Sequence, residues 1–147
     1  MGSSRKVLYE ALGAYIDDLS NALYIGTARG RIAMSNGNGE YEITPSNGSM
    51  PLIDIFYKRG ALEFVAFWAN NGENKACRLK VALSKTSLEY HSKQIILRIE
   101  PHGTLKGVTE ITLMGNKEFA NTLRRAIHEE KHRKTKEKCG ILTSSLL

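Results

Sequence analysis

The sequence lacks the features of a secreted or membrane-spanning chain. It has two cysteines, Cys77 and Cys139, which are far apart and show no metal-ligand spacing, so we interpret them as two thiols and leave a disulfide between them open. No run approaches the roughly eighteen apolar residues of a membrane span. Acidic residues interrupt the apolar positions from Val7 to Leu23, unlike a signal-peptide core. We therefore expect an intracellular protein (cytoplasmic, nuclear or nucleoid) with no transmembrane segment.

Catalytic signatures are also scarce. The glycines near residues 37–39 lack the lysine and helix context of a phosphate-binding loop, and no nucleophile-elbow spacing occurs. One pattern, His128 to His132, fits H-E-x-x-H, which on a helix places two imidazoles for a zinc ion and Glu129 as a base. Its neighbours are charged, and the following residues supply one acid, Glu137, and no histidine. A zinc hydrolase is therefore a minor alternative, and we expect a non-enzymatic protein without a cofactor.

The N-terminal part of the sequence is an amphipathic stretch. From Arg5 to Leu23 apolar residues recur at steps of three and four, which predicts a long N-terminal helix. The stripe needs a partner, either the sheet or the same helix of a second subunit, so a homodimer is possible. Met1 to Ser4 could be an expression scar. The stripe consists of Val7, Leu8, Ala11, Leu12, Tyr15, Ile16, Leu19, Ala22 and Leu23.

After Gly26, short runs with turn residues between them predict about six or seven strands of an antiparallel sheet. The last run, Val108 to Leu113, alternates with period two and is followed by the break at Gly115-Asn116. We predict the α+β class and one domain over residues 1–147. The predicted strands are 31–34, 40–44, 52–58, 61–69, 76–83, 94–100 and 108–113.

A C-terminal amphipathic helix is expected to follow. Phe119, Ala120, Leu123 and Ile127 have helical spacing, which predicts that the first turns of this helix pack on the sheet. From His128 to Lys138 the sequence holds no residue suited to a core, so we predict a basic extension beyond the fold. Residues 139–147 are expected to form a flexible tail.

Basic and aromatic residues suggest a partner. The net charge of +6 favours a polyanion. Single-stranded nucleic acid is bound by rings that stack on bases and by cations that neutralise phosphates, so we predict a single-stranded DNA or RNA partner. Both faces of the 61–69 strand are largely apolar, however, so its second face is either covered by the first helix or open for stacking. The predicted contacts are Tyr57, Lys58, Arg59, Phe67, Trp68, Arg78, Lys80, Arg98, Arg124, Arg125, Lys131, Arg133 and Lys134.

The order of elements also carries two resemblances. A sheet ending in Gln94 to Glu100, a turn, Thr109 to Leu113 and a helix from Asn116 resembles the repeat of the Whirly and Pur-alpha proteins, which implies single-stranded nucleic-acid binding on a sheet. Several strands followed by a closing helix are also similar to pleckstrin-homology-like domains. That second resemblance implies an alternative function, a module that binds proteins or lipids.

Overall fold

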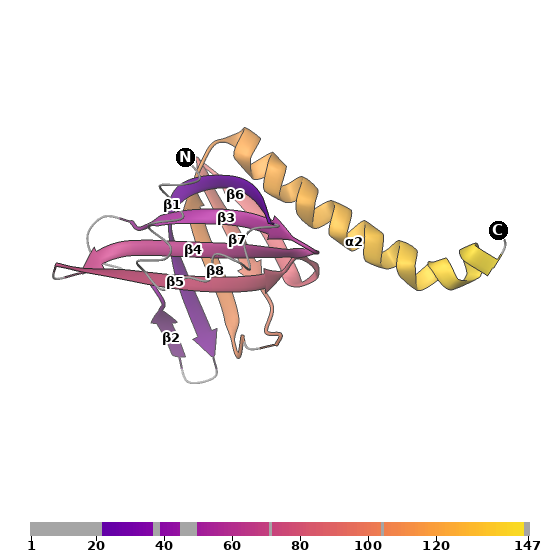
Figure 1. The fold of residues 1–147 in the computed structure, drawn as a ribbon, viewed down its shortest axis with the longest axis horizontal. Coiled ribbons are helices and arrows are strands. Elements are labelled where there is room, and N and C mark those ends of the chain that lie inside the picture. Colours follow the sequence, from indigo (N-terminus) through magenta and orange to yellow (C-terminus); the bar gives the residue numbers. More distant parts are fainter. Residues whose placement is uncertain (1–21, 37–38, 45–49, 71, 104, 146–147) are drawn as a thin grey trace.

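The computed structural model describes residues 22–36, 39–44, 50–70, 72–103 and 105–145. These residues form eight strands, one 3-10 turn and one α-helix (Figure 1). The elements are β1 (Leu23–Asn36), β2 (Gly39–Glu42), β3 (Leu52–Lys58), β4 (Ala61–Asn70), β5 (Glu73–Ala82), η2 (Leu83–Lys85), β6 (Thr86–His91), β7 (Gln94–Ile99), β8 (Val108–Met114) and α2 (Lys117–Ser145).

The long strand β1 belongs to both halves of the sheet. The strand order is β5-β4-β3-β1-β8-β7-β6, with β2 also beside β1, and all pairs are antiparallel. Leu23 to Arg29 pair with β3, whereas Gly30 to Ser35 pair with β8. A Cβ atom at Gly30 would lie 2.3 Å from the carbonyl oxygen of Thr112. Glycine therefore permits the close strand approach at the point where β1 changes partner.

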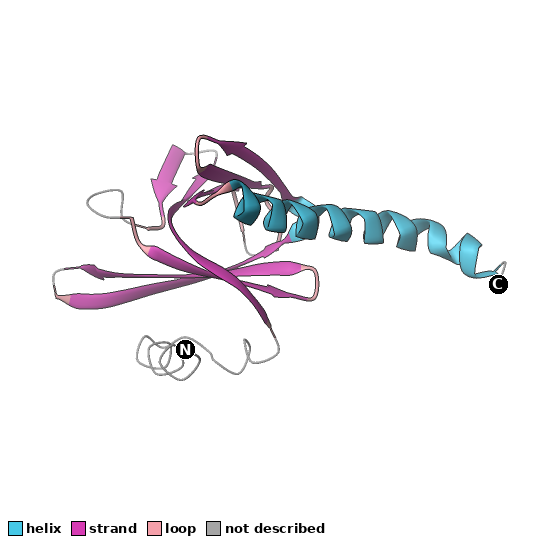
Figure 2. Cartoon of the chain, turned by 90° about the horizontal axis from the view of Figure 1, so that it is seen from above, coloured by secondary structure: helices cyan, strands magenta, loops and turns pink. Residues whose placement is uncertain are grey.

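The core fills the space between the two halves, and α2 covers it (Figure 2). Alternate residues of β7 and β8 are buried in this core, as the period of two requires. Among the described side chains of α2, the buried apolar ones are Ala120, Leu123 and Ile127, and the helix contacts η2 and β6. Glu130 is the last buried residue described on this helix, and beyond it α2 extends away from the sheet (Figure 1). The predicted C-terminal helix that starts on the sheet and continues outward is confirmed.

The predicted α+β class with a long N-terminal helix is wrong, because the described fold is dominated by strands. Residues 5–21 lie outside the described residues, but Leu23, the predicted end of that helix, already pairs with Tyr57 in the sheet. The helical spacing of apolar residues runs on through Leu23, so periodicity alone hides the change to a strand. The strand β6 was missed because its only apolar residues, Leu88 and Tyr90, sit among polar ones.

Candidate functional site

A groove opens where β1 leaves the partner β3 and passes toward β8. One hollow of about 420 Å³ lies between β1 and the first turns of α2, and a second of about 530 Å³ continues from it along β1. Thr27, Ala28 and Met114 line both hollows, so the two form one groove. The first is completed by Gly115, Asn116, Glu118, Phe119 and Thr122, and the second by Arg29, Met50 and Leu52. We call this surface the β1–α2 groove.

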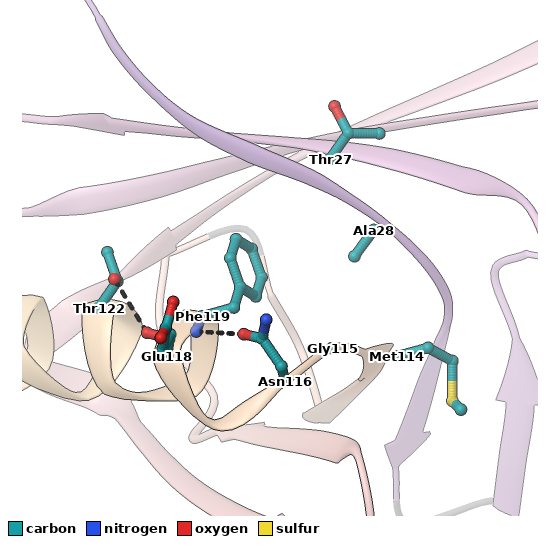
Figure 3. Close-up of a pocket in the computed structure, with 8 residues that line it drawn as sticks. All are labelled: Thr27, Ala28, Met114, Gly115, Asn116, Glu118, Phe119 and Thr122. Atoms are coloured by element: carbon teal, nitrogen blue, oxygen red, sulfur yellow. Dashed lines mark hydrogen bonds between the residues drawn. The ribbon is translucent and has the colours of Figure 1, made fainter.

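The start of α2 forms one wall of the groove (Figure 3). Asn116 caps the helix, because its side-chain Oδ1 accepts a 2.8 Å hydrogen bond from the backbone N–H of Phe119. The Thr122 hydroxyl donates to the Glu118 carbonyl oxygen at 3.1 Å. Figure 3 shows the Phe119 ring and the Ala28 methyl pointing into the space between helix and strand. The cap therefore fixes an apolar ring in the groove wall.

Glycine in β1 lets this wall approach closely. A Cβ atom at Gly26 would lie 2.7 Å from Cε2 of Phe119, closer than side chains tolerate. The pairing of β1 with β3 also shifts register between Tyr24 and Gly26. This irregular stretch bends β1 beside the helix, so Gly26 determines how close α2 lies to the strand.

One exposed large apolar residue lines the groove. Leu23, Tyr24 and Met114 are the exposed large hydrophobic residues among those described, and Met114 lines both hollows with 39% of its surface exposed. Polar groups around them are already engaged: the Thr27 hydroxyl donates to Asp54 at 2.5 Å and also hydrogen-bonds to Tyr24, while Arg29 donates to the Met50 carbonyl at 3.0 Å. The lining offers apolar contact, the Arg29 guanidinium and one carboxylate, that of Glu118.

The aromatic rings predicted to stack on bases do not share an open face. Tyr57 and Trp68 are partly buried and pack against the main core. Phe67 lies on the opposite face, where it packs against Phe56 and Val65. Neighbouring residues on a strand point to opposite sides, so Phe67 and Trp68 cannot form one platform. These rings contribute to packing in the described fold.

The sheet cations are also dispersed. Arg78 forms an ion pair with Glu63, with Nη2 at 2.5 Å and Nε at 2.7 Å from Oε2, and the Glu63 side chain is buried. Arg98 lies in the other half of the sheet, 4.0 Å from Glu110. Lys80 is exposed on β5. Lys58 and Arg59 lie at the β3–β4 turn, where Arg59 has a positive φ of 49°. Arg78 and Lys80, two residues apart on β5, point to the same side of the sheet, whereas Arg98 lies in the other half, so the structure does not bring all of these cations onto one surface.

Cations of α2 remain more accessible. Arg124, Arg125 and Lys131 are exposed, and Arg124 donates a 3.2 Å hydrogen bond to Asn121. Arg133 is held by Glu130, with Nη2 at 2.6 Å from Oε1. The side chain of Lys134 lies outside the described residues. Part of the predicted basic helix thus forms an exposed surface.

The H-E-x-x-H pattern falls on the exposed side of α2. His128 and His132 stack with ring centroids 6.4 Å apart. Across the described residues, no group of three or more His, Cys, Asp or Glu side chains is placed to hold a metal ion. Cys77 is half-buried on β5, and this burial raises the pKa of its thiol. Within the same residues, no helix combines the length and apolar character needed to cross a membrane.

Sequence reasoning missed the β1–α2 groove. Met114 ends the alternating run of β8 at a position that faces outward. A large apolar residue is unexpected there, and this was the one feature of the sequence that could have indicated the groove. The sequence also showed that the alternating pattern ends at Gly115-Asn116. These residues lie close to Ala28 only because β1 and β8 pair over a long distance in the sequence. No pattern within one segment could place these residues together.

Comparisons with known proteins include a distant structural likeness. No protein-family model matches the chain, and no curated protein matches it. A crystal structure of the Ran binding domain from the nuclear complex component Nup2 of Ashbya gossypii is 14% identical, with a TM-score of 0.46, over 77% of this chain and 97% of that one. A likeness this distant carries no argument about function. The resemblance to Whirly and Pur-alpha proteins, the nucleic-acid partner and the homodimer stay predictions.

Proposed function

We propose that this protein is a non-enzymatic interaction module of pleckstrin-homology-like architecture, which binds an extended segment of a partner protein in the β1–α2 groove. The architecture rests on the order of elements, an antiparallel sheet followed by a closing helix. The observation that carries the function is the exposed Met114 side chain beside two connected hollows. Exposed apolar surface beside a groove is typical of an interaction site.

The shape of the groove favours an extended peptide. Its two hollows follow β1, one beside Phe119 and the other beside Met50 and Leu52. Side chains two residues apart on an extended chain point to the same side. A peptide lying along β1 would therefore place one apolar side chain in each hollow, against Ala28 and Met114. A compact ligand would fill only one of them.

The positive charge of the protein favours a peptide in which acidic residues flank the apolar ones. The protein carries a net charge of +6, which attracts acidic segments during encounter. Arg29 lines the second hollow and lies at the exposed surface. Glu118 lines the first hollow, so an acidic flank is better placed at the Arg29 end. Weakening of the complex as salt increases would follow from this arrangement.

A peptide-display selection tests the proposal. The full-length protein is used to select from a random peptide library, and the affinity of the selected peptide is measured by fluorescence polarisation. We expect Met114→Asp to weaken binding by at least about tenfold, equal to about 1.4 kcal/mol. Leu23→Asp is the matched control, because Leu23 is more exposed but does not line the groove. A library that yields no binder, or equal binding by the Met114→Asp variant, would argue against the groove.

A second candidate function is binding of single-stranded nucleic acid by α2. The exposed Arg124 and Arg125 favour it, since surface cations neutralise phosphates. Fluorescence polarisation with single- and double-stranded DNA and RNA at two salt concentrations provides the measurement. The double variant Arg124→Glu and Arg125→Glu should abolish binding, whereas Lys93→Glu, an exposed cation in the β6–β7 turn, should retain it. Absence of binding to every oligonucleotide would exclude this candidate.

A further inference from the structure

The two edges of β1 are occupied differently along the strand. In the sheet order β3-β1-β8, β3 and β8 lie on opposite edges of β1. The strand β3 pairs with Leu23 to Arg29, whereas β8 pairs with Gly30 to Ser35. Before Gly30, no described strand therefore lies on the β8 side of β1. We call this side of β1, from the register shift at Tyr24–Gly26 to Gly30, the groove edge.

The strand β8 leaves β1 beside the groove edge. Gly30 pairs with Leu113. Continued by two residues, this register would pair Ala28 with Gly115. Both of these residues instead line the first hollow of the β1–α2 groove. The Gly115 N–H donates to the Lys93 carbonyl oxygen at 2.9 Å, in the β6–β7 turn, and α2 begins two residues later. The hollow thus lies where a neighbouring strand of β1 would run.

The main-chain N–H of Arg29 points to the groove edge. The Gly30 N–H donates to the Pro51 carbonyl oxygen at 3.0 Å, on the β3 side. Neighbouring residues of a strand direct their main-chain groups to opposite edges. The Arg29 N–H therefore faces away from β3, and Arg29 lines the second hollow. A carbonyl oxygen of a bound peptide could accept a hydrogen bond from this donor.

We infer that the partner peptide adds to the groove edge as a short strand, with main-chain hydrogen bonds to β1 that include one from the Arg29 N–H. The inference rests on the proposed function and specifies how its peptide is held. An extended chain presents main-chain N–H and C=O groups for such pairing, whereas a helix uses them within itself. Because the register shift and β8 limit the groove edge on both sides, only a few peptide residues pair.

The charge at one end of the groove edge fits an acidic flank. The pairing of β8 closes the edge at Gly30, so the peptide leaves it beside Arg29. The Arg29 side chain is exposed, and its Nη1 donates to the Met50 carbonyl oxygen at 3.0 Å. A guanidinium has several further N–H donors, which suit a carboxylate. We therefore expect the paired segment of the peptide to be followed or preceded by an acidic residue at this end.

An amide-to-ester scan of the display-selected peptide tests the inference. Each variant replaces one main-chain N–H by oxygen and keeps every side chain, and its affinity for the full-length protein is measured by fluorescence polarisation. We expect a position at which the ester weakens binding about fivefold, as for the loss of one hydrogen bond. Esters at the two neighbouring positions, whose N–H groups point away from β1, should bind like the parent peptide. Equal affinity throughout, or losses at consecutive positions, would overturn the inference.

Hydrogen exchange provides a second measurement on the unmodified protein and peptide. Saturating peptide should slow exchange of the Arg29 N–H at least about tenfold, because it becomes hydrogen-bonded. The Lys80 N–H is the matched control. It lies on the same edge of β5 as the Ala82 N–H, which faces away from β4 and donates to His102, so its exchange should stay the same. Unchanged exchange at Arg29 with the peptide bound would overturn the inference.

These results separate the strand pairing from the proposed function. A peptide whose binding depends on Met114, but which has no sensitive ester and leaves Arg29 exchange unchanged, would disprove only the strand pairing. Failure to select any peptide that depends on Met114 would remove the proposed function and, with it, the strand pairing.

Discussion

At the scale of single residues, two glycines determine the path of β1. Gly30 sits where the strand changes partner, and Gly26 sits under the Phe119 ring. Neither needs glycine because of a positive φ; each needs it because a methyl group would occupy filled space. The fold therefore depends at these positions on the absence of a side chain.

Gly30→Ala is expected to destabilise the protein. The new methyl would lie 2.3 Å from the Thr112 carbonyl oxygen, and a backbone atom cannot yield as a flexible side chain can. We expect a loss of about 2 kcal/mol, typical of overpacking, measured by urea unfolding. Gly72→Ala is the control, because Gly72 has open space around it and only a positive φ of 80° to strain. A larger loss at Gly72 than at Gly30 would contradict this account.

The Cys77 thiol should react slowly. Burial raises its pKa, so less of the reactive thiolate exists at neutral pH than in an exposed cysteine. In a Cys139→Ser background, we expect alkylation by iodoacetamide to be slower than that of a short cysteine peptide, with its pH midpoint displaced upward. A midpoint at or below that of the peptide would show that the thiol is not desolvated.

At the scale of elements, α2 and β1 show which parts of the fold can be predicted from sequence and which cannot. The apolar spacing from Phe119 to Ile127 is local, and it correctly predicted a helix that packs on the sheet. The start of β1 was missed because an apolar run that fits a helix can equally pair with β3. Arg78 looked available from sequence, yet Glu63, its partner, comes from another strand. Pairings of this kind depend on register, which no single segment encodes.

Removing the cap of α2 should loosen the groove wall. Asn116→Ala removes the acceptor for the Phe119 N–H, and loss of an N-cap typically costs about 1 kcal/mol. We expect this loss in urea unfolding, together with faster hydrogen exchange at Phe119 and Ala120. Asn116→Asp retains an acceptor and should keep both properties. Equal behaviour of the alanine and aspartate variants would show that the cap does not hold the helix start.

At the scale of the whole molecule, one strand joins two half-sheets, and the groove lies where they separate. Short apolar runs joined by turn residues correctly predicted an antiparallel sheet. The sequence does not show which residues of distant strands lie side by side, so the groove could not be predicted. Met114 and Ala28 meet because Gly30 pairs with Leu113 across β1 and β8. The exposed cations of α2 lie on a separate element and form a different candidate surface.

The most direct measurement is a titration of the labelled full-length protein with the display-selected peptide, followed by amide chemical shifts in NMR. We predict saturable shifts at Ala28, Met114 and Phe119, while Arg124 and Arg125 stay unperturbed. Shifts confined to the cations of α2, or to Asp54 on β3 and Val65 on β4, would contradict recognition of a partner in the β1–α2 groove.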